Sequence, residues 1–261
     1  MKTSITIFVL AGLFFAAPTP TKPVTAKRVP IEVKKLMACY PDFVVGFADN
    51  HILLKDKARL LWDDGVKDKP FQQLLDEPDI KDMFGQKYEK GAMASPPTKN
   101  SDPGRIRNEA FFLKMYGQTE AAVRGNLTEI TWCPKLVGQK IMVTKINGID
   151  KKFTEISNEL DEHPELKQYL VNIAGTFAWR NISGTNRHST HSFGMTMDIN
   201  TDYTNYWQWD CKCKNEDADV TYRNRIPQII VDIFEKHGFI WGGKWYHYDT
   251  MHFEYRPELL N

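Results

Sequence analysis

The spacing of apolar residues predicts short helices and short strands through the second half of the chain. Apolar residues recur at helical spacing over 105–116, 150–160 and 226–237, and Gly238 is expected to end the last of these helices. Runs rich in β-branched and aromatic residues predict strands, and these cover 130–133, 140–146, 174–182, 195–200 and 252–255. Helices interleaved with short, non-adjacent strands predict an α+β fold with a small antiparallel sheet and flanking helices.

Residues 1–26 have the pattern of a secretory signal peptide. Lys2 precedes an apolar run over 5–17, and prolines follow it closely. The run is too short to span a bilayer, which needs roughly 20 residues, and no cysteine follows it closely enough for a lipid anchor. The cleavage site stays open between Ala16 or Ala17 and Ala26. We expect a protein that is secreted or periplasmic and has no stable membrane anchor.

Composition divides the remaining chain and limits its partners. A polar, proline-containing stretch over 89–103 predicts a boundary between an N-terminal region, 27–99, whose role the sequence does not indicate, and a second domain over 100–261. The chain has 261 residues and a net charge of +1, without a basic half, so nucleic acid is not expected as a partner. The sequence does not indicate an oligomeric state.

Four cysteines permit two disulfide bonds in an exported protein. They are Cys39, Cys133, Cys211 and Cys213. Only Lys212 separates the last two, and so small a loop is strained, so we do not expect Cys211 to pair with Cys213. The connectivity otherwise stays open, with at least one bond expected to involve Cys211 or Cys213.

Two short segments contain the candidate chemistry. Residues 189–198 contain His191 and Asp198, and residues 249–254 contain Asp249 and His252. Two imidazoles and one carboxylate can hold a Zn²⁺ ion and leave its fourth position open, as in catalytic zinc sites. On one regular strand, the odd offset between His191 and Asp198 would place the two side chains on opposite faces. His191 is therefore expected in a bend, with Gly194 turning the chain toward the strand of Asp198.

The same residues resemble those of a known family. The pattern Ser189-x-His191-x-x-Gly194-x-x-x-Asp198, followed by Asp249-x-x-His252, is similar to the M15 zinc metallopeptidases of the D-alanyl-D-alanine carboxypeptidase and L-alanyl-D-glutamate endopeptidase type. The resemblance covers about residues 100–261. It implies a zinc-site fold of the kind shared with the hedgehog signalling domain, His191, Asp198 and His252 as the zinc ligands, and Asp249 as the catalytic base.

The resemblance also implies an arginine that binds the substrate carbonyl or carboxylate. Arg180, in the expected strand before the metal motif, is the favoured residue, and Arg187, nearer to His191, is its competitor. Ser189 either contacts the substrate or caps the loop. Glu254 follows His252 at an offset of two, which places it on the same face of a strand, either beside the ligand or as a surface carboxylate.

The function expected from these residues is hydrolysis of amide bonds in the peptide stems of peptidoglycan by a secreted zinc peptidase. Metal motifs do not distinguish a D,D-carboxypeptidase from an L-Ala-D-Glu endopeptidase. Two alternatives are an inactive zinc-containing binding module of the same fold and a cell-wall amidase. The presence of Asp249 favours an enzyme over the binding module.

Overall fold

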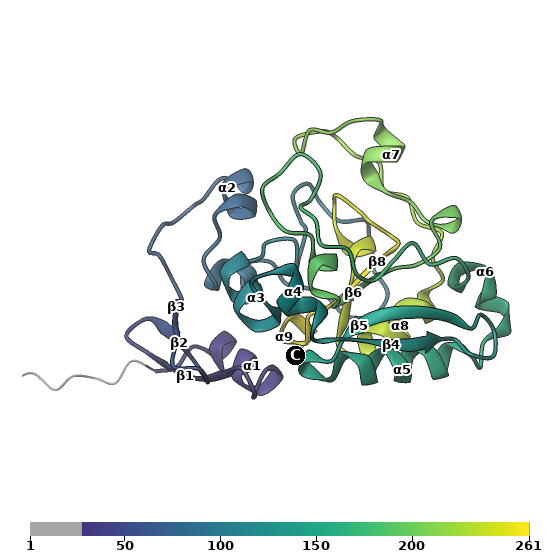
Figure 1. The fold of residues 1–261 in the computed structure, drawn as a ribbon. Helices are drawn as coiled ribbons and strands as arrows, with labels where there is room; N and C mark the ends of the chain where they lie inside the picture. Colours follow the sequence, from purple (N-terminus) through teal and green to yellow (C-terminus); the bar gives the residue numbers. More distant parts are fainter. Residues whose placement is uncertain (1–27, 261) are drawn as a thin grey trace, which may run out of the picture.

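The computed structural model describes residues 28–260, so the expected signal peptide lies outside the described residues. Short helices surround small antiparallel sheets, and the predicted α+β class is confirmed. Three sheets lie within the described residues: β1-β2-β3, β4-β5 and β6-β8-β7 (Figure 1). The helices of the ribbon are α1 (Ile31–Cys39), α2 (Phe71–Asp76), α3 (Glu109–Tyr116), α4 (Glu120–Arg124), α5 (Ile149–Leu160), α6 (Lys167–Leu170), α7 (Trp207–Cys211), α8 (Gln228–Lys236) and α9 (Pro257–Leu260).

The N-terminal region packs against the last helix of the described chain. It contains α1 and a sheet of three short strands, β1 (Val44–Ala48), β2 (His51–Leu54) and β3 (Arg59–Leu61). Helix α1 contacts α9, and the Tyr40 hydroxyl after α1 donates a buried hydrogen bond to the Glu258 carboxylate in α9. One cluster of buried apolar side chains extends from Val33 in α1 to Tyr255. The region before residue 100 therefore shares its core with the rest of the chain.

A hairpin and a helix form the middle of the structure. Strands β4 (Leu127–Trp132) and β5 (Gln139–Thr144) pair antiparallel, and α5 packs across them. The apolar residues of α5 at helical spacing, Phe153, Ile156 and Leu160, are fully buried. The two predicted strands and the predicted helix are confirmed here, to within three residues at their ends.

The third sheet brings distant parts of the chain together. Strands β6 (Thr196–Asp198), β8 (His252–Tyr255) and β7 (Phe239–Trp241) pair antiparallel with β8 at the centre. Helix α8 precedes β7 and packs on it, and Gly238 adopts a positive φ of 92° between them. The register places Asp198 directly opposite His252.

Two predicted elements differ in the structure. The predicted strand over 174–182 is wrong, because this segment forms only isolated bridges. Gly175 bridges to Asp198 at the end of β6, and Asn181 bridges to His188 in the loop before the 3-10 turn of His191. The helix predicted from residue 105 begins at Glu109, where the Asn108 side chain caps it by accepting a hydrogen bond from the Phe111 amide. Residues 105–108 therefore precede the helix.

Candidate metal centre and active site

His191 lies in a tight turn that is fixed at both ends. It belongs to a 3-10 helix, Thr190–Phe193, and the Ser189 hydroxyl before this helix accepts a hydrogen bond from the His191 amide. Gly194 ends the turn with a left-handed φ of 65°, and a Cβ at this position would lie 2.6 Å from the Leu127 side chain. A side chain at residue 194 would thus be strained and crowded. The bend expected from the sequence is present.

The turn and the central sheet bring three potential ligands to one point. His191 Nε2 lies 3.1 Å from Asp198 Oδ2, and His252 Nδ1 lies 3.0 Å from Asp198 Oδ1. One ligand atom of each residue falls within 4.8 Å of the others. Within residues 28–260, the buried His191 Nε2 atom has no partner in hydrogen-bonding geometry, although a carboxylate oxygen is close. An orphaned imidazole nitrogen beside a carboxylate fits a cation bound between them.

Glu254 holds the far side of the His252 ring. Its fully buried carboxylate lies 3.1 Å from His252 Nε2 and accepts a hydrogen bond from the Thr190 hydroxyl. Two arginines neutralise it, Arg107 at 3.1 Å and Arg256 at 3.0 Å. A carboxylate on Nε2 keeps the proton of the neutral ring there and leaves Nδ1 free as a ligand. Of the two roles considered for Glu254, the surface carboxylate is wrong.

Asp249 approaches the centre through a close backbone contact. Its amide donates a 3.0 Å hydrogen bond to the Gly242 carbonyl, and a Cβ at Gly242 would lie 2.6 Å from the Asp249 carbonyl oxygen. The Asp249 Oδ1 atom is buried and has no hydrogen-bond partner among the residues that the structure describes. The carboxylate is therefore available to a ligand of the site.

The surroundings shift the pKa values of the carboxylates at the centre in opposite directions. Burial and the negative charge of Asp198 raise the pKa of Asp249 to about 7. Burial also opposes ionisation of Asp198, but His191 and His252 hold its pKa well below its usual range. The pKa of Glu254 is lowered to about 2 because Arg107 and other cationic neighbours outweigh its burial. Asp198, with its lowered pKa, is suited to be a metal ligand, and Asp249, with its raised pKa, is suited to be an acid–base group.

These residues line a cavity of about 710 Å³. His191, Asp198, Asp249 and His252 lie in its wall together with Ser189. Arg180 also lines it, with an exposed side chain that makes one long hydrogen bond, 3.5 Å, to the Asn181 carbonyl. The structure thus places every site residue predicted from the sequence in the wall of one cavity, Arg187 included.

A scan against family models gave one match at this site. Residues 183–255 match the model described as D-alanyl-D-alanine carboxypeptidase, and this segment contains His191, Asp198, Asp249 and His252. The predicted resemblance to the M15 peptidases is confirmed. The match supports a peptidase, and hence a hydrolase. A search of curated proteins and a search of solved structures gave no match.

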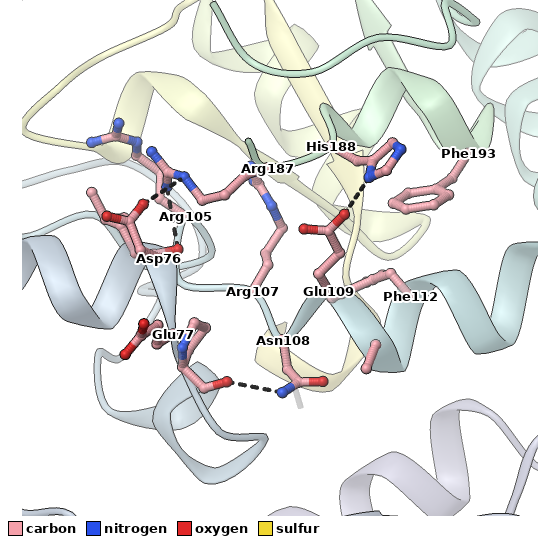
Figure 2. Close-up of a pocket in the computed structure, with 13 residues that line it drawn as sticks. Asp76, Glu77, Arg105, Arg107, Asn108, Glu109, Phe112, Arg187, His188 and Phe193 are labelled. Carbon is pink, nitrogen blue, oxygen red and sulfur yellow. Dashed lines mark hydrogen bonds and ion pairs between the residues drawn. The ribbon is translucent and has the colours of Figure 1, made fainter. Parts of the chain in front are cut away.

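Arg187 lies inside the matched segment, and its side chain has different partners from that of Arg180. Its Nε atom lies 3.2 Å from the Asp76 carboxylate at the end of α2, and its Nη1 atom lies 3.4 Å from the Leu75 carbonyl (Figure 2). Arg180 lies before the matched segment and has no ion pair within the described residues. The two candidate arginines are therefore not equivalent.

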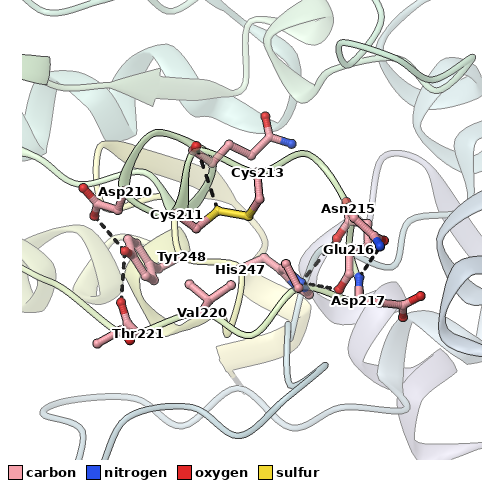
Figure 3. The surroundings of a disulfide bond; sticks show 12 residues. Asp210, Cys211, Cys213, Asn215, Glu216, Asp217, Val220, Thr221, His247 and Tyr248 are labelled. Carbon is pink, nitrogen blue, oxygen red and sulfur yellow. Dashed lines mark hydrogen bonds and ion pairs between the residues drawn. A yellow bond between two sulfur atoms is a disulfide. The ribbon is translucent and has the colours of Figure 1, made fainter.

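A short disulfide-bonded segment lies beside the rim of this cavity, where Trp209 and Lys214 line it. Cys211 and Cys213 are bonded to each other (Figure 3), which corrects the expectation that they would not pair. Lys212 between them adopts a left-handed φ of 55° at the end of α7 and turns the chain, so that the two Cα atoms lie 5.2 Å apart. Trp209 in α7 lines the cavity and is 58% exposed.

The other histidines near the centre have partners of their own. His247 is buried and bonds Asp102 through Nδ1 at 2.6 Å and the Glu216 carbonyl through Nε2 at 2.8 Å. His188 pairs with Glu109. Neither belongs to the cluster of ligand atoms.

A second group of carboxylates in the described residues already holds a cation of the chain. Asp63, Asp64 and Asp79 lie close together. The Lys69 ammonium lies 2.6 Å from both Asp64 and Asp82, and this contact supplies the positive charge that the group needs. No helix within residues 28–260 is long and apolar enough to cross a membrane.

Proposed function

We propose that this protein is a secreted zinc-dependent peptidase that hydrolyses amide bonds in the peptide stems of bacterial peptidoglycan. The observation that carries the proposal is the convergence of His191, Asp198 and His252 in a cavity that Asp249 also lines, within the segment that matches the carboxypeptidase family. A D,D-carboxypeptidase and an L-Ala-D-Glu endopeptidase both fit, because metal ligands indicate the reaction and not the bond.

His191 through Nε2, Asp198 through a carboxylate oxygen and His252 through Nδ1 would hold one Zn²⁺ ion. Two imidazoles and one carboxylate are a donor set that zinc accepts, and His191 Nε2 has no competing hydrogen bond. When bound, zinc supplies Lewis-acid activation of a water molecule and of the scissile carbonyl. Glu254 keeps the Nε2 proton of His252 in place and so fixes the ligand tautomer.

Asp249 acts as the general base and then as the acid. A carboxylate with a pKa raised to about 7 takes a proton from water and delivers it to the leaving amine near neutral pH. Its unpartnered, buried Oδ1 atom is available for that proton. Retention of this carboxylate favours an enzyme over an inactive zinc-containing binding module.

Arg180 orients the scissile carbonyl. Its guanidinium lines the cavity and has no ion pair in the described part of the chain, so its donors are available for an oxygen that gains negative charge during the reaction. Arg187 contributes to substrate binding at another part of the same wall. Ser189 serves the site indirectly, because its hydroxyl caps the turn of His191.

Residues 100–261 would form the zinc peptidase domain, with the fold shared by D-Ala-D-Ala peptidases and the hedgehog domain. The sheet β6-β8-β7, which carries Asp198 and His252, supports this. Residues 27–99 would form a region packed against that domain, as the contact of α1 with α9 favours. Export agrees with the Cys211–Cys213 disulfide, since disulfides persist in oxidising compartments.

Digestion of purified muropeptides tests the proposal. We expect the zinc-loaded protein to release the terminal D-alanine or to cut between L-alanine and D-glutamate, and mass spectrometry of the products identifies the bond. A chelator should stop the reaction and added zinc should restore it. Separation of the whole stem from the sugar would indicate an amidase instead. Binding of stems without any product would indicate an inactive module.

A further inference from the structure

Three arginines lie where the active-site cavity meets a smaller one. Arg105, Arg107 and Arg187 line both the large cavity and a neighbouring cavity of about 210 Å³. The smaller cavity lies between residues 75–78, which end and follow α2, and the start of α3 (Figure 2). The N-terminal region thus forms one wall of a space that shares lining residues with the active-site cavity.

The lining of the large cavity is cationic away from the metal centre. Apart from the residues of the metal centre, the charged side chains in this lining are four arginines, one lysine and one glutamate: Arg105, Arg107, Arg180, Arg187, Lys214 and Glu216. The Glu254 carboxylate that pairs with Arg107 is fully buried and is not part of the lining. Asp76, which pairs with Arg187, lines only the smaller cavity, together with Glu77 and Glu109. A ligand in the large cavity therefore meets an excess of positive charge.

The arginines at this junction differ in how fully their donors are used. Arg105 bonds Glu216 with two nitrogens, at 2.8 and 2.9 Å, and Asp102 at 2.9 Å. Arg107 makes one ion pair within the described residues, with Glu254. The Nε atom of Arg187 is buried without good hydrogen-bond geometry. A guanidinium has five N–H donors, so Arg107 and Arg187 have donors left for a ligand.

The positive charges at the junction also repel one another. Burial lowers the pKa of Arg107 to about 10, and the charges of Arg256, Arg187 and Arg105 act in the same direction against its ion pair with Glu254. Burial and the charge of Arg105 lower the pKa of Arg187. An anion bound between the two side chains would relieve this repulsion.

We infer that Arg107 and Arg187 form a subsite for a carboxylate of the substrate, separate from the position at which Arg180 contacts the scissile carbonyl. Planar guanidinium groups bind carboxylates through paired, charge-assisted hydrogen bonds, which combine strength with a defined orientation. The inference rests on the proposed peptidase function and deepens it: the preferred substrate is an acidic peptide. Its carboxylate is either at the C-terminus or on an internal acidic residue, and the chemistry of recognition is the same.

Synthetic stem peptides with and without each carboxylate test the subsite. The parent peptide has both carboxylates free; one derivative is amidated at the C-terminus and a second at the internal acidic residue. We expect the wild-type protein to prefer the free acid over one of these amides by about 10- to 100-fold in kcat/KM, the scale of charge-assisted hydrogen bonds. The derivative that shows the loss identifies which carboxylate is bound.

Arg187 is the residue to change, because Arg107 also supports Glu254 in the metal centre. In Arg187→Gln, the preference for the acid should fall below about 3-fold, because kcat/KM falls much more for the acid than for the amide. Arg187→Lys should recover part of the preference. Asp76→Asn removes the competing carboxylate and should keep or raise the preference. Arg124→Gln is the control, since Arg124 is exposed and pairs with Glu120 outside the cavity lining.

Two results would overturn the subsite. One is a wild-type preference that persists in Arg187→Gln, and the other is an equal loss of turnover on acid and amide. Calorimetric titration of the same peptides separates this inference from the proposed function. If the wild-type protein binds the acid more tightly than the amide and Arg187→Gln does not, the subsite stands even where no peptide is cleaved.

Discussion

The floor and the rim of the large cavity are built in different ways. The floor consists of β6 and β8, and the polar side chains of Asp198, His252 and Glu254 on these strands are held by neighbours on more than one side. The rim includes Arg180 and α7, where a short turn is closed by a disulfide and Trp209 is largely exposed. The floor is suited to fix a metal ion and the rim to contact a substrate. Changes in the floor should therefore affect metal binding, whereas changes in the rim should affect turnover with the metal retained.

The largest effect is expected for the ligands in and beside the floor. His191→Ala or His252→Ala removes one of three metal donors, so hydrolysis should stop. Loss of a residue that only supports a metal ligand typically lowers affinity by roughly 10- to 100-fold, and zinc affinity should fall by more than this here. Metal analysis after dialysis measures the loss. Stoichiometric zinc in both variants would show that the metal is held elsewhere.

The Asp249→Ala variant distinguishes most directly between the hydrolytic step and metal binding. The variant should keep its zinc and its fold but lose about 10²- to 10⁴-fold in hydrolysis, the usual contribution of a general base. In the wild-type protein the acidic limb of the kcat/KM profile should lie at or below pH 7. The base must be deprotonated, its pKa is raised to about 7 without metal, and a bound cation lowers it. Normal turnover by zinc-loaded Asp249→Ala would exclude this role.

Arg180→Ala tests the rim. We expect kcat and kcat/KM to fall together by about 10²- to 10³-fold with zinc fully retained, because the oxyanion contact is made in the transition state. Arg180→Lys should recover little, since an ammonium group lacks the planar fork. If Arg187→Ala gives this kinetic pattern and Arg180→Ala does not, the two roles must be exchanged.

Glu254→Gln probes the support beneath the floor. The change keeps the shape of the side chain but removes the charge that pairs with His252, Arg107 and Arg256. Zinc affinity should fall by about 10- to 100-fold, measured by competition with a chelator, and saturating zinc should restore most of the activity. Unchanged affinity would mean that Glu254 serves only the stability of the fold.

The smallest effect is expected at the disulfide. Replacing both Cys211 and Cys213 by serine opens a very small loop, so the free energy of unfolding should fall by less than about 2 kcal/mol on the loop-entropy account. Zinc binding should be unchanged, because the segment belongs to the rim. Loss of zinc in this double variant would contradict the division between floor and rim.

Local sequence patterns predicted the candidate site residues better than the distant residues that hold them in place. The spacing around Gly194 predicted the bend at His191, and the offset of two predicted that Glu254 shares a face with His252. No local pattern indicated Arg107, because its contact with Glu254 joins residues 147 apart in the chain. The failed strand over 174–182 has the same origin, since its two bridges join it to the end of β6 and to the loop before the turn of His191, which pattern reasoning does not place beside it.

The cysteine pair shows a different limit. Ring size alone argued against a bond between Cys211 and Cys213, but one residue in a left-handed conformation brings the two side chains together. Lysine does not favour the left-handed backbone conformation, so Lys212 gives no sign of it in the sequence. The sequence therefore indicated which cysteines are close in the chain and not how the backbone turns between them.

The hydrogen bond between Tyr40 and Glu258 has a consequence for the order of folding. It closes a loop of 218 residues and is the far end of a chain of contacts that passes through Arg256 and Glu254 to His252. Contacts between such distant residues form only after a large entropy of loop closure has been overcome, so they belong to the late steps of folding. During refolding, tight zinc binding should therefore arise together with the docking of α1, and not in the earlier collapsed states of the chain.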